Sequence, residues 1–192
     1  MFLLIPFVVA QTAEEEMFIK QSIDTIREYI TAIMLELRSK ECGENIQQSL
    51  EYTYFMTRCH LQNQHLLLVL NSAMVASFKI KNFIDAAAFA NQILANPDVH
   101  NNPSANAGLV TKAKKVLARC EKDGRNAGPS CIIDRPFLID LLSFTPVYKE
   151  ENCVTCPYCS ASYKEEANGK VCAVCGVAQI GLKTLGLVCR KQ

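Results

Sequence analysis

Apolar residues recur at helical spacing through much of the chain, and they are densest over residues 64–94. Residues 65–80 are apolar on nearly every side of a helix, so other elements must cover this helix on more than one side. Lys81 and Asn82 interrupt the pattern, and a second helix follows with four apolar residues near one face: Phe83, Ala87, Ala90 and Leu94. Two antiparallel helices joined by a tight turn are the unit of helical solenoids. The pattern predicts that this hairpin is the structural core.

Further helices are expected on both sides of the hairpin. Residues 13–42 follow a typical helix start at Thr12 and carry apolar residues at spacings of three and four: Phe18, Ile19, Ile23, Ile26, Ile30, Ile33, Met34 and Leu37. A helix over residues 44–60 should turn Ile46, Leu50 and Tyr54 inward. A last helix, over residues 107–122, should follow a polar loop at residues 101–104.

The pattern changes after residues 123–129, DGRNAGP, which form the one clear linker. Beyond it, short extended pieces are expected at residues 135–140 and 144–148, and residues 181–190 alternate as a strand pair does. We therefore expect an α-helical solenoid domain at residues 1–128 and a small β-rich unit at residues 129–192. The expected fold class is mostly α, a TPR-like helical-hairpin solenoid followed by a zinc-ribbon-like unit.

Composition adds one anomaly, ten cysteines in 192 residues. The net charge of +1 gives no general reason to expect nucleic acid or an anionic membrane as a partner. Cys42, Cys59 and Cys120 are scattered through helical sequence as small buried hydrophobes are, whereas five cysteines cluster at residues 153–175. A secreted disulfide scaffold would be dense in cysteine throughout, so the distribution favours a reducing, intracellular compartment.

Residues 1–11, MFLLIPFVVAQ, resemble a signal peptide only in part. They lack the positively charged segment of such peptides, and Pro6 interrupts the apolar run. We expect instead an apolar helix end and a proline turn packed against the body, which would make the chain a fragment.

Two C-x2-C knuckles carry the strongest chemical signal: Cys156 with Cys159, and Cys172 with Cys175. Zinc is held by four tetrahedral thiolates, and each knuckle supplies two adjacent corners. Gly176 would let the chain leave the second knuckle through a positive φ. These four cysteines are the expected ligands of a structural zinc, with Cys153 as the spare. The alternatives are free thiols and, less favoured, a thioredoxin-like redox motif, for which the βαβ context is missing.

No catalytic residues are expected. The histidines, His60, His65 and His100, stand apart, and no metalloprotease, nucleophile-elbow or phosphate-loop motif is present. A site closed by four cysteines has no open coordination position, so zinc catalysis is not implied. The basic group at residues 112–119 lacks the aromatic residues that stack on bases, which is typical of a solvated helix face.

An ordered set of short segments resembles the C-terminal domain of coatomer subunit alpha. The segments lie at residues 5–6, 27–30, 65–70, 78–83, 86–87, 89–90, 120–122, 136–137, 146–148, 156–157, 169–172 and 180–181. The resemblance implies a non-enzymatic scaffold of the COPI coat in retrograde Golgi-to-ER and intra-Golgi transport. It implies the coatomer epsilon subunit and other coatomer subunits as partners, no nucleic acid, and membrane association only through the coat, at the cytosolic face of the Golgi and its vesicles.

Two departures limit the resemblance. The β-propellers and long solenoid of full alpha subunits are missing, and Leu138 stands where the family usually has aspartate. The knuckles are more complete than in many members, so the zinc prediction depends on the spacing in this chain. A zinc-ribbon module binding nucleic acid or protein is the alternative, but basic residues near the knuckles are balanced by glutamates. A thiol oxidoreductase is the less favoured enzymatic alternative.

Overall fold

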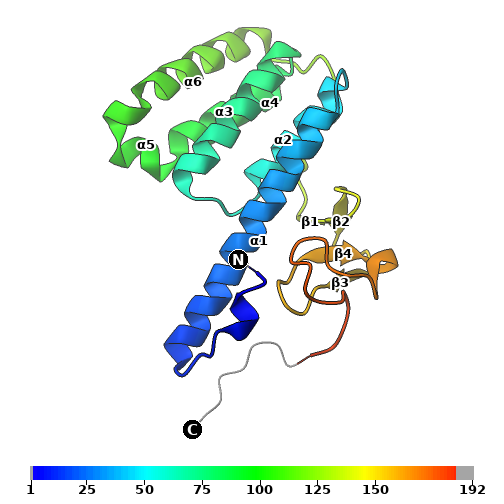
Figure 1. Ribbon diagram of the computed structural model, residues 1–192. Helices are drawn as coiled ribbons and strands as arrows, with labels where there is room; N and C mark the ends of the chain where they lie inside the picture. The colour runs from blue at the N-terminus through cyan, green and yellow to red at the C-terminus, as the bar shows by residue number, and fades with distance from the viewer. Residues whose placement is uncertain (1, 185–192) are drawn as a thin grey trace. The chain divides into compact units, whose positions relative to one another are not determined.

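Figure 1 shows the computed structural model of the chain, which describes residues 2–184. The described part is mostly helical, with two small β-hairpins toward its end, which confirms the expected fold class. Its elements, in order, are η1 (Ile5–Phe7), α1 (Ala13–Glu41), α2 (Ile46–Thr57), α3 (Asn63–Lys79), α4 (Phe83–Ala95), α5 (Pro97–Asn101), α6 (Pro103–Asp123), β1 (Phe137–Ile139), β2 (Pro146–Tyr148), β3 (Cys153–Thr155), β4 (Ser162–Lys164) and η2 (Glu165–Ala167).

The chain forms two compact units, and α1 contributes to both of them. The first consists of Met1–Ile33 with Arg135–Gln192, and the second is Met34–Asp134. The expected domain division at residue 128 stays a prediction. Within residues 2–184, no helix combines the length and the apolar character needed to cross a membrane.

The α3–α4 hairpin is the core of the second unit, as the apolar pattern predicted. Leu67, Leu70 and Met74 of α3 are buried, and so are Phe89 and Ile93 of α4. Helix α4 packs against both α3 and α6, and the three lie side by side in Figure 1. Small residues on α4, among them Ala86 and Ala90, are fully buried, which lets neighbouring helices approach closely.

The prediction of a polar loop at residues 101–104 is wrong, because helices occupy most of this stretch. A short helix, α5, ends at Asn101, and α6 already begins at Pro103. Proline suits the first helical turn, where a backbone N–H has no partner within the helix. Asn96 caps α5, since its side chain accepts a hydrogen bond of 2.9 Å from the Asp98 N–H.

The inward face expected for α1 and α2 is only partly correct. Ile23 and Leu50 are buried, whereas Phe18, Ile33, Leu37 and Ile46 are exposed. Leu35, which the pattern did not single out, is fully buried. Helix α1 is 29 residues long, and different neighbours cover it along that length, so one continuous apolar stripe cannot describe it.

The linker at residues 123–129 is fixed to the turn between α3 and α4. The buried Asn82 side chain donates to the Pro129 carbonyl at 2.9 Å and accepts from the Gly128 N–H at 2.9 Å. The buried Asp85 carboxylate accepts hydrogen bonds from three donors within residues 126–131, in the linker and directly after it. They are Asn126 Nδ2 at 2.9 Å, Ser130 Oγ at 2.7 Å and the Cys131 N–H at 3.0 Å. Buried polar side chains therefore determine the course of this segment.

The first hairpin of the first unit confirms the extended pieces expected at residues 135–140 and 144–148, whereas the sequence pattern does not predict the second hairpin. Strands β1 and β2 pair antiparallel, with Leu138 opposite Val147, and β3 and β4 pair with Val154 opposite Tyr163. The buried Asp140 carboxylate joins the hairpins, accepting from the Ser143 N–H at 2.9 Å and the Lys164 N–H at 3.2 Å. Of the strand pair expected at residues 181–190, residues 181–184 contain no strand, and the remainder lies outside the described residues.

Candidate metal centre

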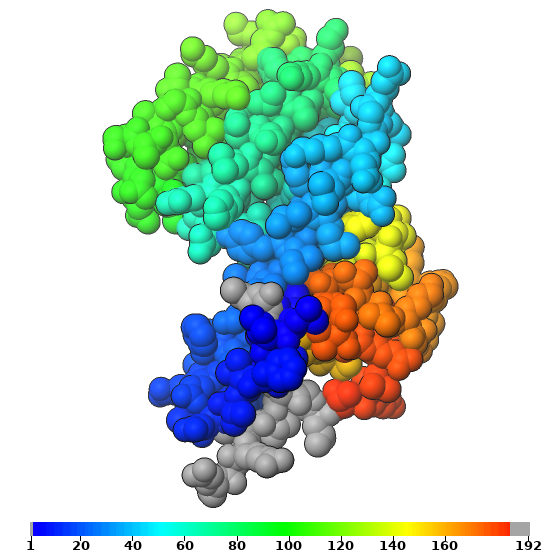
Figure 2. Space-filling view, viewed as in Figure 1, coloured from blue at the N-terminus to red at the C-terminus, as the bar shows by residue number. Residues whose placement is uncertain are grey.

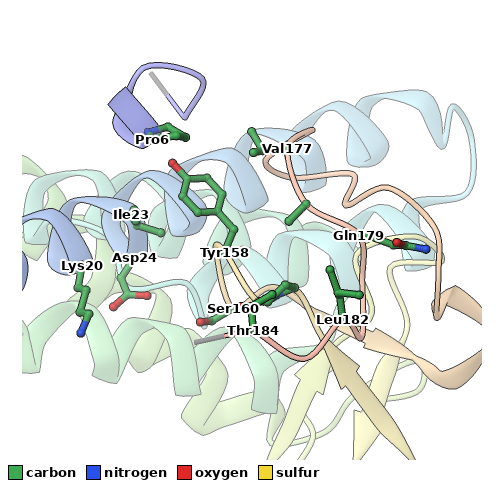
Figure 3. A pocket seen from close by; sticks show the side chains of 12 residues that line it. Pro6, Lys20, Ile23, Asp24, Tyr158, Ser160, Val177, Gln179, Leu182 and Thr184 are labelled. Carbon is green, nitrogen blue, oxygen red and sulfur yellow. The ribbon is translucent and has the colours of Figure 1, made fainter. Parts of the chain in front are cut away.

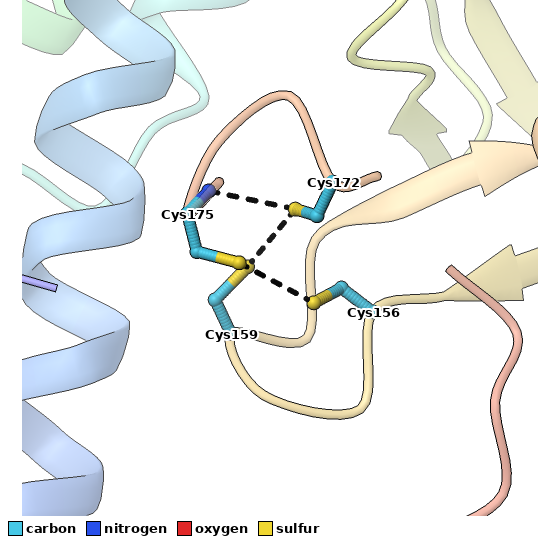
Figure 4. A group of neighbouring side chains, drawn as sticks. All are labelled: Cys156, Cys159, Cys172 and Cys175. Carbon is cyan, nitrogen blue, oxygen red and sulfur yellow. Dashed lines mark hydrogen bonds between the residues drawn. The ribbon is translucent and has the colours of Figure 1, made fainter. Parts of the chain in front are cut away.

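Four buried cysteines converge from two loops of the first unit: Cys156, Cys159, Cys172 and Cys175 (Figure 4). Their Sγ atoms all lie within 4.8 Å of one another. The first pair lies between β3 and β4, and the second lies beyond η2. The structure thus brings together, at one point, the four cysteines that the C-x2-C spacing predicts as metal ligands.

The distances between the sulfurs fit a tetrahedral metal ion. Cys156 Sγ lies 3.7 Å from Cys175 Sγ, and Cys159 Sγ lies 3.5 Å from Cys172 Sγ. Four sulfurs held about 2.3 Å from a central zinc would be separated by about 3.8 Å. A disulfide would need about 2.05 Å, so these cysteines are not bonded in pairs.

Both knuckles are built by the same backbone turn. The Ser160 N–H bonds to the Cys156 carbonyl at 2.9 Å, and the Gly176 N–H bonds to the Cys172 carbonyl at 2.9 Å. The residue after the second cysteine has a positive φ in each knuckle, 58° at Ser160 and 66° at Gly176. The sequence predicted this conformation at Gly176 and missed it at Ser160, where serine gives no signal of it.

Backbone N–H groups point at two of the sulfurs. The Cys175 N–H donates to Cys172 Sγ at 3.5 Å, and the Val177 N–H donates to Cys175 Sγ at 3.5 Å. Hydrogen bonds from the thiols of Cys156 and Cys159 lower the pKa of Cys172, while hydrogen bonding to Cys156 and Cys172 raises the pKa of Cys159. The opposite directions show that one thiolate at Cys172 disfavours a second thiolate at Cys159, so holding several thiolates together would require a cation.

Residues of α1 and the N-terminal segment support the first knuckle. Arg27 on α1 donates from its guanidinium to the Cys159 carbonyl at 2.9 Å. The Tyr158 hydroxyl donates to the Phe2 carbonyl at 2.9 Å, and the two rings meet edge to face with centroids 5.8 Å apart. These supporting residues were not identified from the sequence, because no spacing relates them to cysteines more than 130 positions away.

Cys153 lies outside the cluster. It begins β3, is half-buried, and its sulfur contacts the carbonyl of the next residue, Val154, at 3.8 Å. The register places it opposite Lys164 rather than toward the knuckles. The four converging sulfurs therefore form a complete set without it.

A cavity of about 680 Å³ lies beside the first knuckle, between α1 and residues 177–184 (Figure 3). Several of the polar groups that line it have partners within the chain. Lys20 pairs with Glu16 at 2.5 Å, Asp24 pairs with Arg27 at 2.5 Å, and the Tyr158 hydroxyl is bonded to Phe2. The charged side chains of the lining, Lys20 and Asp24, are therefore engaged in ion pairs.

The other residues considered for chemistry are dispersed. His60, His65 and His100 are each exposed on the helical unit, and none belongs to the metal-ligating cluster of residues 2–184. Lys112 of the basic group on α6 bonds to Asn71 Oδ1 at 3.0 Å, and Arg119 pairs with Asp123 at 2.9 Å. This face is therefore partly neutralised by its own neighbours.

Comparisons with known proteins relate the whole chain to coatomer alpha subunits. A family model described as the C-terminus of the coatomer (COPI) alpha subunit matches residues 1–192. Coatomer subunit alpha-2 of Oryza sativa subsp. japonica is 31% identical over 185 residues, covering 96% of this chain and 15% of the relative. Coatomer subunit alpha of Dictyostelium discoideum is 36% identical over 182 residues, covering 88% of this chain and 14% of the relative. The chain spans about 15% of the length of the curated relatives it matches.

Proposed function

Because the chain belongs to the family formed by the C-terminal regions of coatomer (COPI) alpha subunits, we propose that it is a non-enzymatic scaffold piece of the COPI coat. The family match along residues 1–192 is the observation that carries this proposal. The proposed role is to bind the coatomer epsilon subunit, together with other coatomer subunits, in retrograde Golgi-to-ER and intra-Golgi transport. Contact with the membrane would then come only through the coat, on the cytosolic face of the Golgi and of COPI vesicles.

The N-terminal segment and the first turns of α1, drawn in blue in Figure 2, carry exposed apolar side chains, which supports a role in assembly. This apolar surface consists of Leu3, Leu4, Phe7, Val8, Val9, Met17 and Phe18. Phe7 is 84% exposed and Val9 is 80% exposed. Seven exposed apolar side chains within residues 3–18 are typical of a surface that binds another protein. We propose that this surface is where the epsilon subunit binds.

A binding measurement with matched variants tests the partner. Isothermal titration of the wild-type chain with the epsilon subunit of the same organism should show saturable binding. Phe7→Asp should weaken binding at least tenfold, because a buried charge at an interface is costly. Leu68→Asp is the control, since Leu68 is also exposed, at 65%, but lies on α3 outside the apolar surface. Equal binding by both variants would show that epsilon does not use this surface.

A nucleic-acid binding assay distinguishes the coat scaffold from the alternative function, a nucleic-acid-binding zinc ribbon. An electrophoretic shift with duplex and single-stranded probes should show no binding by the wild-type chain. A shift that weakens steeply with salt, together with no epsilon binding, would favour a nucleic-acid-binding zinc ribbon and refute the coat scaffold.

We also propose that Cys156, Cys159, Cys172 and Cys175 hold one structural zinc per chain. Four buried thiolates would supply a complete tetrahedral set of ligands, and the ion would tie the two knuckles together. Elemental analysis of protein purified without chelator should find one zinc. Cys153→Ser should keep it and Cys159→Ser should lose it. Protein without metal, or loss on changing Cys153, would refute this ligand set.

A further inference from the structure

Tyr163 on β4 places a hydroxyl group against the cysteine cluster. The side chain is completely buried, and its Oη lies 3.1 Å from Cys172 Sγ. The Ala173 N–H donates to the same Oη at 3.1 Å. The hydroxyl is thus held between a sulfur and a backbone N–H that belong to the second knuckle.

These two neighbours determine the direction of the hydrogen bond. The Ala173 N–H can only donate, so the Tyr163 oxygen acts as its acceptor. A cysteine bound to a metal has lost its proton, so its sulfur can only accept. The phenolic hydrogen therefore points from Tyr163 to Cys172 whenever a metal occupies the cluster.

We propose that Tyr163 is a positioning residue of the metal centre, donating a hydrogen bond to the Cys172 thiolate that helps to retain the metal. This inference rests on the proposed zinc site. The bond orients the Cys172 side chain and withdraws charge from its sulfur, as the outer partners of metal ligands generally do. Cys172 also accepts from the Cys175 N–H, so it receives two donors, one of which is a side chain that can be changed.

Tyr163→Phe removes the hydroxyl and keeps the buried ring. The metal dissociation constant, measured by competition between the protein and a chromophoric chelator for zinc, should rise about tenfold. Tyr148→Phe is the matched control, because Tyr148 belongs to the same unit on β2 and its ring contacts Arg135 rather than a cysteine. The control variant should bind zinc as the wild type does.

Cobalt(II) in place of zinc gives an absorption spectrum whose band positions would not change through a general loss of stability. Removing the donor leaves more charge on the Cys172 sulfur, so the sulfur-to-cobalt charge-transfer band of Tyr163→Phe should shift to longer wavelength. Tyr148→Phe should leave the band in place. If Tyr163→Phe does not fold, wild-type protein made with 3-fluorotyrosine carries stronger phenol donors, and its band should shift to shorter wavelength.

The outcomes distinguish this inference from the metal site itself. A wild-type chain that takes up neither zinc nor cobalt would refute the metal site, and the role of Tyr163 with it. A wild-type chain that binds metal, with an unchanged dissociation constant and band in Tyr163→Phe, would overturn only the role of Tyr163. An unmoved band in the fluorotyrosine protein would overturn it as well.

Discussion

Replacing Asp85 with alanine should destabilise the helical unit by far more than an average surface substitution. Asp85 lies in the first turn of α4 and is buried. Its oxygens accept from Asn126, Ser130 and the Cys131 N–H, all on the segment that follows α6. The substitution therefore tests whether that segment is held by this one carboxylate.

The size of the loss depends on whether each donor can find another hydrogen-bond acceptor once the carboxylate is removed. The Cys131 N–H is buried and would lose its acceptor, which costs about 1–3 kcal/mol. Ser130 is exposed and Asn126 half-exposed, so both can turn to water and each should lose only about 0.5–1 kcal/mol. An acidic group in the first turn of a helix contributes a further ~0.5 kcal/mol. The total is about 4 kcal/mol.

Urea unfolding followed by helical circular dichroism measures this change. Asp85→Asn should cost about half as much, because the amide keeps one acceptor oxygen but turns its NH2 toward another donor. Asp134→Ala is the control, an exposed aspartate on the same segment, expected to change stability by less than about 0.5 kcal/mol. A loss below about 1 kcal/mol in Asp85→Ala would show that the segment is held by other contacts.

Three further outcomes are expected. Removal of metal by a chelator should leave most of the helical circular dichroism signal, because the proposed ligands all lie outside Met34–Asp134; collapse of that signal would mean that both units unfold together. Gly181→Ala should lower the melting temperature, since Gly181 has a φ of 77° and a Cβ there would collide with the Asn168 side chain, whereas Gly108→Ala meets open space within α6 and should not. Burial alone would raise the pKa of Asp140, but hydrogen bonds from Ser143 and Lys164 outweigh burial and lower it. The ionised carboxylate therefore stabilises the fold at pH values above the ordinary aspartate pKa. This stabilisation decreases as the pH falls below about 4. Acid titration of unfolding should show this loss in the wild type and a flatter profile in Asp140→Asn, and identical profiles would refute it.

The sequence predicted those features that depend on short spacing. Helical periodicity located α3 and α4, and the C-x2-C spacing identified the cysteines that converge. The sequence pattern indicates Asn82 only as a break between helices, although its buried side chain anchors the linker. A polar residue whose partner lies more than 40 positions away leaves no periodic signal, and Tyr163 beside Cys172 likewise belongs to no repeating pattern. Polar contacts outside any periodic pattern are therefore one class of feature that the sequence does not reveal.

The two knuckles also have a consequence for the unfolded chain. An ion shared by Cys156 and Cys175 would close a loop of about 20 residues, and in chain-entropy terms a cross-link of that length stabilises the folded state by about 3 kcal/mol. A disulfide would give a similar restriction but would be opened by reductant. A metal cross-link persists under reducing conditions and opens when the free metal concentration falls. The stability of the first unit would then depend on the metal supply of its surroundings.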